Sequence, residues 1–265
     1  MTAWVYGMEV NQIILLRLID GLIAIAASFV LFKVILKESG SKVFTVILMT
    51  SLLIILHDIT YVLYGFRNSI WVAYLPLFTA LLVWQNTSKE DKYSFYLIGG
   101  LVSLGVLLRE PFLPFFLFTG LAILIGYGWQ MLMKYLIGSA LLGFTVLGFI
   151  MMLRDWDFID LVSSYMKYSQ TIETVGFKFP LTIIKSNWFI FFTATASIFY
   201  LVKLRCTDKK AVNIYRAFFW VSIALLPIPE YYLKLGMAYH FNNCLPGLAG
   251  LTALAWKYMS NQESK

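Results

Sequence analysis

The chain has 265 residues, of which 60% are hydrophobic and 13% are charged. Because a soluble domain carries about 25% charged residues, this composition argues against a water-soluble protein and indicates that a bilayer covers much of the surface. The formal net charge of +7 requires no nucleic acid partner, since cytoplasmic loops that face anionic lipid are commonly basic.

The long apolar runs of the sequence predict helices. Strands of a membrane barrel would alternate in segments of about ten residues, and backbone groups in hydrocarbon have to be satisfied locally. In chain order we predict nine transmembrane helices, at about 13–32, 43–64, 69–84, 93–108, 112–128, 135–153, 187–203, 212–228 and 245–259. The expected fold is all-α, a polytopic helical membrane protein with residues 1–265 in a single transmembrane domain.

An additional helix is expected in the outer loop 154–186. Asp155 or Asp157 is placed to cap it. The apolar residues that follow at helical spacing are Phe158, Leu161, Val162 and Tyr165. A helix with one apolar face can lie on a membrane surface, so anchoring at the interface is one interpretation and a lid over an active site is the other.

Basic residues divide the loops into two sets. The richer set comprises the segments 33–42, 89–92, 203–216 and 257–265 together with Lys134. By the positive-inside rule these segments are cytoplasmic, which places the N-terminus outside and the C-terminus inside the cytoplasmic membrane. Since the first residues show no signal-peptide pattern, we expect either a first span that inserts with its N-terminus leading, or an upstream span or small membrane subunit.

Polar residues collect at the helix ends that are predicted to lie outside. The second span ends with His57, Asp58 and Arg67, and the fourth ends with Arg109 and Glu110. Ionisable residues inside a membrane are costly and usually face a partner or a cavity. The simpler interpretations are a structural pair of Asp58 with Arg67 or His57, and a plain turn with a solvated Arg109–Glu110 pair.

A third polar group precedes the last span and contains Tyr239, His240 and Asn243. An aromatic cluster at the membrane interface accounts for the tyrosine, whereas the imidazole and the amide can bind an anion or a sugar hydroxyl. The sequence has two histidines, too few for a histidine-rich metal site, and no motif of soluble enzymes. We assign no metal ligands, and a divalent cation held by carboxylates stays open as a cofactor.

Four stretches resemble the polytopic type C glycosyltransferases, which include protein mannosyltransferases and the aminoarabinose transferase of lipid A. Residues 5–35 contain Leu-Arg ahead of an apolar span, and 64–84 look like a short outer turn before a helix. Residues 96–117 form a Gly-rich run that ends in a basic residue, and 238–256 have aromatic residues and His before a Leu-Pro helix start. The resemblance implies a sugar taken from a polyprenyl-phosphate donor outside the cytoplasm.

Such a transfer needs cations to hold the phosphate leaving group and a carboxylate that acts as base or holds a metal. The candidate catalytic carboxylates are Asp58 and Glu110. The candidate substrate-binding residues are His57, Arg67, Arg109, Tyr239, His240 and Asn243. The family carries its main catalytic acid in an outer loop that precedes the matched stretches, so we expect a core of a transferase that transfers poorly by itself.

Two other functions stay open, a flippase or transporter of a lipid-linked sugar and a non-catalytic membrane subunit. Transporters often contain inverted repeats and broken helices near the midplane. Here the polar residues gather at one face and we identify no internal repeat, which favours the enzyme. The expected partners are a polyprenyl-phosphate sugar and membrane lipid.

Overall fold

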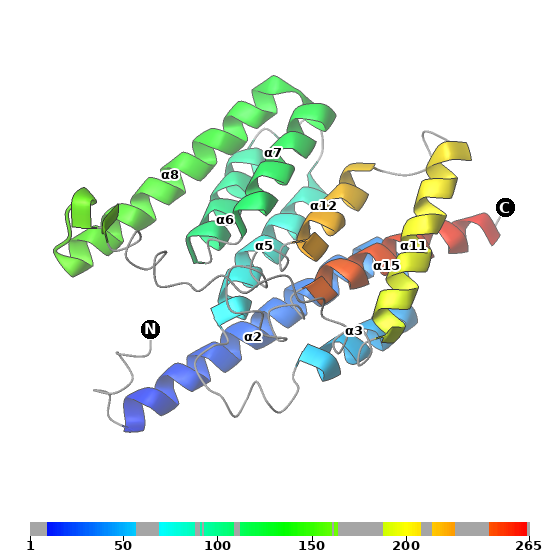
Figure 1. Cartoon of the computed structure of the whole chain (residues 1–265), viewed down its shortest axis with the longest axis horizontal. Coiled ribbons are helices and arrows are strands. Elements are labelled where there is room, and N and C mark those ends of the chain that lie inside the picture. Colours follow the sequence, from blue (N-terminus) through cyan, green and yellow to red (C-terminus); the bar gives the residue numbers. More distant parts are fainter. Residues whose placement is uncertain are drawn as a thin grey trace, which may run out of the picture.

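Figure 1 shows a computed structural model of the chain, which describes residues 10–56, 69–87, 91, 93–108, 112–160, 162–163, 188–207, 214–225 and 244–263. Its long elements in these ranges are all helices, which confirms the all-α prediction. They are α2 (Val10–Ser39), α3 (Lys42–Leu56), α5 (Ser69–Asn86), α6 (Ser94–Leu108), α7 (Leu113–Tyr127), α8 (Trp129–Arg154), α11 (Trp188–Thr207), α12 (Ile214–Leu225) and α15 (Leu245–Glu263). Each of the nine apolar segments predicted from sequence overlaps one of these helices.

Helix α2 is longer than predicted at its C-terminal end. The expected span stopped at residue 32, before the first lysine, but the helix continues to Ser39. The continuation has a buried stripe at helical spacing, formed by Leu31, Ile35 and Glu38, while the lysines between them are exposed. Gly40 then ends the helix with a φ of 71°, and its N–H donates to the Leu36 carbonyl at 2.9 Å.

Helices α6 and α8 form the tightest pair in the bundle. Each carries the tetrapeptide Tyr-Leu-Ile-Gly, at 96–99 and 135–138. The pair is parallel and reciprocal, because each glycine lies against the backbone carbonyl of the tyrosine in the other copy. Ser139 Oγ also donates to the Gly99 carbonyl at 2.9 Å. Small residues at such a crossing let two backbones approach closely.

Aromatic contacts show which helix ends lie together. Tyr127 packs on both Trp84 and Phe95, with ring centroids 6.0 and 4.9 Å apart, so α5 and α7 end where α6 begins. Tyr74, near the start of α5, packs on Phe112 at 5.3 Å, just before α7 begins. The helices therefore reverse direction from one to the next and define two opposite ends of the bundle.

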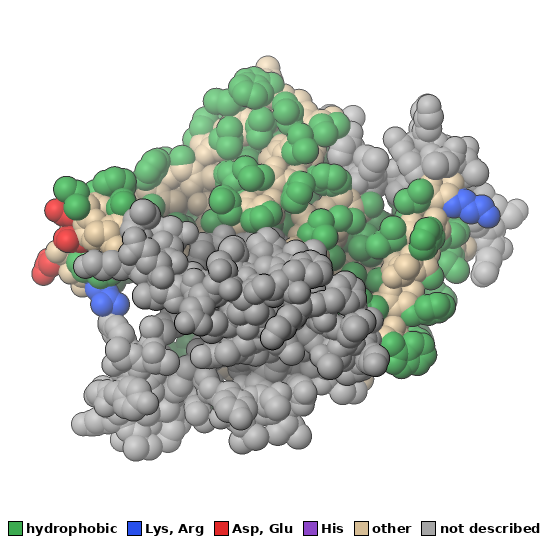
Figure 2. Space-filling model, viewed as in Figure 1, with side chains coloured by type: hydrophobic (Ala, Val, Ile, Leu, Met, Phe, Trp, Pro, Cys, Tyr) green, Lys and Arg blue, Asp and Glu red, His purple; other side chains and the backbone are tan. Residues whose placement is uncertain are grey.

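Hydrophobic side chains cover most of the described surface that faces the viewer in Figure 2, and charged side chains appear towards its left and right edges. Among the described ranges, α8 is the one helix long and apolar enough to cross a membrane, and 17% of its apolar window is buried inside the protein. Other apolar helical segments in these ranges have 10–17 residues. The polytopic membrane arrangement stays a prediction.

Candidate functional site

The residues predicted for an outer site lie outside the described residues. They are His57, Asp58, Arg67, Arg109, Glu110, Tyr239, His240 and Asn243. The helix ends that flank their three segments are described, and several of them lie together. Gly105 of α6 approaches Ala73 and Leu77 of α5, and Gly247 of α15 lies against Ala224 of α12. These contacts sit at the ends of α6 and α12 and the starts of α5 and α15.

Phe115, near the start of α7, packs on Phe219 in the middle of α12, with ring centroids 4.9 Å apart. Phe219 also packs on Trp84 near the end of α5, so this contact does not join the starts of α5 and α7 to the end of α12. The two pairs of helix ends, α5 with α6 and α12 with α15, are each established by themselves. A shared site of the predicted outer residues stays a prediction.

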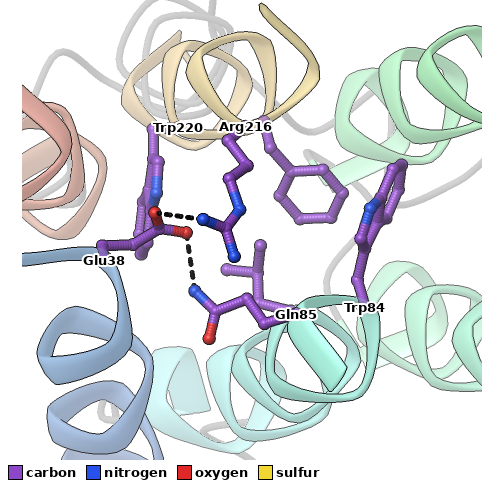
Figure 3. A pocket seen from close by; sticks show the side chains of 7 residues that line it. Glu38, Trp84, Gln85, Arg216 and Trp220 are labelled. Carbon is purple, nitrogen blue, oxygen red and sulfur yellow. Dashed lines mark hydrogen bonds and ion pairs between the residues drawn. The ribbon is translucent and has the colours of Figure 1, made fainter. Parts of the chain in front are cut away.

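The opposite end of the bundle contains a buried polar cluster that sequence analysis did not predict as a site. Glu38 ends α2 with its side chain 2% exposed, and its Oε2 lies 3.6 Å from Arg216 Nη1 of α12. Gln85 of α5 donates from Nε2 to Glu38 Oε1 at 2.6 Å and to the Val34 carbonyl at 3.3 Å. Figure 3 shows Glu38 between these two partners. One carboxylate therefore ties three helices together.

Aromatic side chains line the cluster. Trp84, Phe219 and Trp220 line the same cavity as Glu38, Gln85 and Arg216, and the cavity volume is about 10 Å³. That is about the space a single water molecule needs, so a sugar does not fit. Glu38 Oε2 and Gln85 Oε1 are buried and, among the described residues, have no hydrogen-bond partner. The 3.6 Å between Glu38 Oε2 and Arg216 Nη1 is an ion-pair distance and is too long for a hydrogen bond.

The residues next to Glu38 and Gln85 in sequence form an exposed polar contact. Lys37 Nζ donates to Asn86 Oδ1, so the neighbours of Glu38 and Gln85 form a second link between α2 and α5. Partial burial lowers the pKa of Lys37, the charges of Arg216 and Lys257 lower it further, and Glu38 raises it. The buried carboxylate of Glu38 and the cations of Arg216 and Lys257 therefore act on the pKa of Lys37 in opposite directions.

Sequence alone gave no reason to group these residues. Glu38 and Gln85 are 47 residues apart, and Glu38 was assigned to a loop on the basic side. The sequence nevertheless contained one indication that Glu38 is buried in a helix. Glu38 follows Leu31 and Ile35 at the spacing of one helix face. Within the described residues, no group of three His, Cys, Asp or Glu side chains is placed to hold a metal ion.

The structure describes the start of the expected interfacial segment. Asp157 Oδ1 accepts the Asp160 N–H at 2.8 Å, and Asp160 Oδ2 accepts the Asp157 N–H at 3.2 Å. This reciprocal cap starts a helical turn at Phe158, whose side chain is exposed. Leu161 and Tyr165 lie outside the described residues, so the amphipathic face stays a prediction.

Comparisons of the chain with protein-family models, with curated proteins and with solved structures find no match.

Proposed function

We propose that the chain is a polytopic helical protein of the cytoplasmic membrane and that it belongs to a lipid-linked sugar transfer reaction at the outer face. The observation that carries the membrane location is the surface of α8. Leu141, Phe144 and Met152 are 65%, 75% and 74% exposed along this helix. Large apolar side chains of this kind gain about 1.5–3 kcal/mol each when they leave water. The protein does not bury these side chains of α8, so contact with lipid would provide this free energy.

Other helices support the same location. Ile25 and Phe29 of α2, Phe192 and Phe199 of α11, and Leu117 of α7 are each at least 60% exposed. Scattered apolar residues on a soluble surface are ordinary, but contiguous apolar surface on several helices is typical of contact with lipid or with a protein partner. The basic loops assign the Glu38 end of the bundle to the cytoplasm.

The transfer reaction is proposed from the residues at the other end. Arg67, Arg109 and His240 supply cations for a phosphate leaving group, and Asp58 supplies a carboxylate, with Glu110 as the second candidate. The water-sized cavity beside Glu38 supports this choice, because it leaves no room for a sugar in the described polar cluster at the predicted cytoplasmic end.

A transfer assay tests the reaction. The purified chain in lipid nanodiscs would receive a radiolabelled polyprenyl-phosphate sugar and a membrane extract that contains acceptors. We expect label to move to an acceptor slowly, because the resembled family carries its main catalytic acid ahead of the matched stretches. Asp58→Asn should slow this residual transfer further, by up to about 10²–10⁴, the usual contribution of a general base. Lys134→Gln, a change at the predicted cytoplasmic end, serves as the matched control.

Two outcomes contradict the proposal. Transfer that is equally fast in Asp58→Asn and the unchanged chain removes Asp58 from the reaction. Movement of the labelled donor between the leaflets of sealed vesicles, without transfer, identifies a flippase instead.

A further inference from the structure

Cations from three helices lie at the end of the bundle that contains the buried Glu38. Lys37 lies near the end of α2, Arg216 near the start of α12 and Lys257 near the end of α15. Helix α15 packs against both α2 and α12, so the three residues surround one end of the bundle. The Arg216 side chain is 23% exposed, and it reaches from the surface to the carboxylate. We call Lys37, Arg216 and Lys257 the basic rim.

The named charges at the rim do not cancel. Glu38 is ion-paired with Arg216, and Lys37 donates to the neutral amide of Asn86. Repulsion from Arg216 and from Lys257 lowers the pKa of Lys37. The stacking of Trp256 on Phe44 places the helical turn that carries Lys257 beside the start of α3, which follows α2 directly. A lysine in the last turn of a helix is favoured by the helix dipole, which accounts for Lys37 alone. It gives no reason for cations from three helices to converge.

The surface next to the rim is apolar and aromatic. Trp256, the neighbour of Lys257, is 38% exposed and stacks on Phe44 of α3 with ring centroids 4.4 Å apart. Val43, the residue before Phe44, is 71% exposed. Met259, one turn before the end of α15, is 45% exposed. Tryptophan at the level of the headgroups, next to lysine, is typical of a membrane interface.

We propose that the basic rim binds the phosphate of an anionic lipid headgroup, with the acyl chains against the apolar surface around Trp256. The inference rests on the membrane location proposed above and is independent of the transfer reaction. Charge-assisted contacts from Lys and Arg hold phosphate oxygens, and the rim supplies them from three directions. Free phosphate shares this chemistry, but the adjoining apolar surface favours a lipid.

Native mass spectrometry of the full chain tests the proposal. The protein in uncharged detergent would receive equal amounts of phosphatidylglycerol and phosphatidylcholine. We expect phosphatidylglycerol to be retained preferentially, and the double variant Lys37→Gln/Lys257→Gln to reduce that preference at least about fivefold, the effect expected of roughly one lysine at an anionic surface. Arg216 is left unchanged because it also holds Glu38.

The control is the double variant Lys134→Gln/Lys203→Gln, which removes the same charge at the same predicted face from α8 and α11, two helices that carry none of the rim residues. It should keep the preference. Equal losses in the two double variants would overturn the proposal in favour of a bulk charge effect. Equal retention of the two lipids by the unchanged protein would also overturn it, as would displacement of phosphatidylglycerol by millimolar inorganic phosphate. Unchanged melting of all variants excludes misfolding, and membrane labelling tests the location separately.

Discussion

Gly138 of α8 lies so close to Tyr96 of α6 that a Cβ atom on the glycine would come within 2.1 Å of the tyrosine carbonyl oxygen. The neighbouring atoms are backbone, so they cannot move away as the end of a side chain can. The reciprocal contact, between Gly99 and the Tyr135 carbonyl, is equally tight at 2.0 Å. The α6–α8 pair therefore tolerates no side chain at either crossing.

We expect Gly138→Ala to destabilise the protein by about 3 kcal/mol or more, the upper part of the range for an overfilled core. Gly148→Ala is the control on the same helix, because a Cβ there meets nothing within 4 Å. That change should be neutral or stabilising, by up to about 1 kcal/mol, through helix propensity. Unfolding in mixed detergent micelles, followed by circular dichroism, measures both. Equal stability of the two variants would show that α6 and α8 are not in contact here.

The ion pair of Glu38 and Arg216 should couple α2 to α12. Glu38→Gln keeps the shape of the side chain and removes its charge, while Arg216→Gln removes the other partner. A double-mutant cycle should give a coupling energy of about 0.5–3 kcal/mol, the range for residues in one buried network. Lys33→Gln, an exposed change on α2, should fall within about 0.5 kcal/mol of the unchanged protein. Strictly additive effects would mean that the pair contributes nothing.

Asp91 should give the start of α6 an acid-sensitive component of stability. Its carboxylate accepts the Tyr93 and Ser94 N–H groups, each at 3.2 Å, and the Ser94 hydroxyl. The hydrogen bonds from Ser94 lower the pKa of Asp91. Since the folded-state pKa is below the unfolded one, this stabilisation is complete above the ordinary carboxyl pKa and lost as pH falls through the lowered value.

Asp91→Asn should therefore flatten the acid side of the melting profile, with Asp155→Asn, at the exposed end of α8, as the comparison. A profile that falls as steeply in Asp91→Asn as in the unchanged protein would remove Asp91 from the acid response.

Arg109 should contribute to binding the phosphate of the donor lipid. A charge-assisted hydrogen bond contributes about 1.5–3 kcal/mol, so Arg109→Ala should weaken binding of a polyprenyl phosphate by about tenfold or more. Equilibrium binding of a fluorescent polyprenyl phosphate in nanodiscs measures this, with Arg154→Ala as the control. Unchanged affinity in a folded variant would leave Arg109 as a turn residue.

The helices were predictable because each depends on local information. Apolar runs define them, and Gly40 and Gly128, both with positive φ, end α2 and separate α7 from α8. The Glu38 cluster depends on contacts between distant helices, and the composition of the loops contains no trace of such pairing. Both sides of the α6–α8 crossing carry the tetrapeptide Tyr-Leu-Ile-Gly. A match of four residues does not by itself predict a contact, so the crossing could be recognised only from the structure.

The central claim is that the two ends of the bundle face opposite sides of a membrane. Single cysteines at Ser88 and Gln170, in a chain with Cys206 and Cys244 replaced by serine, test it with a membrane-impermeant maleimide on intact spheroplasts. The account predicts that Gln170→Cys is labelled in intact spheroplasts and that Ser88→Cys is labelled only after permeabilisation. Labelling of Ser88→Cys in intact spheroplasts, or release of the chain from membranes by carbonate, would contradict it.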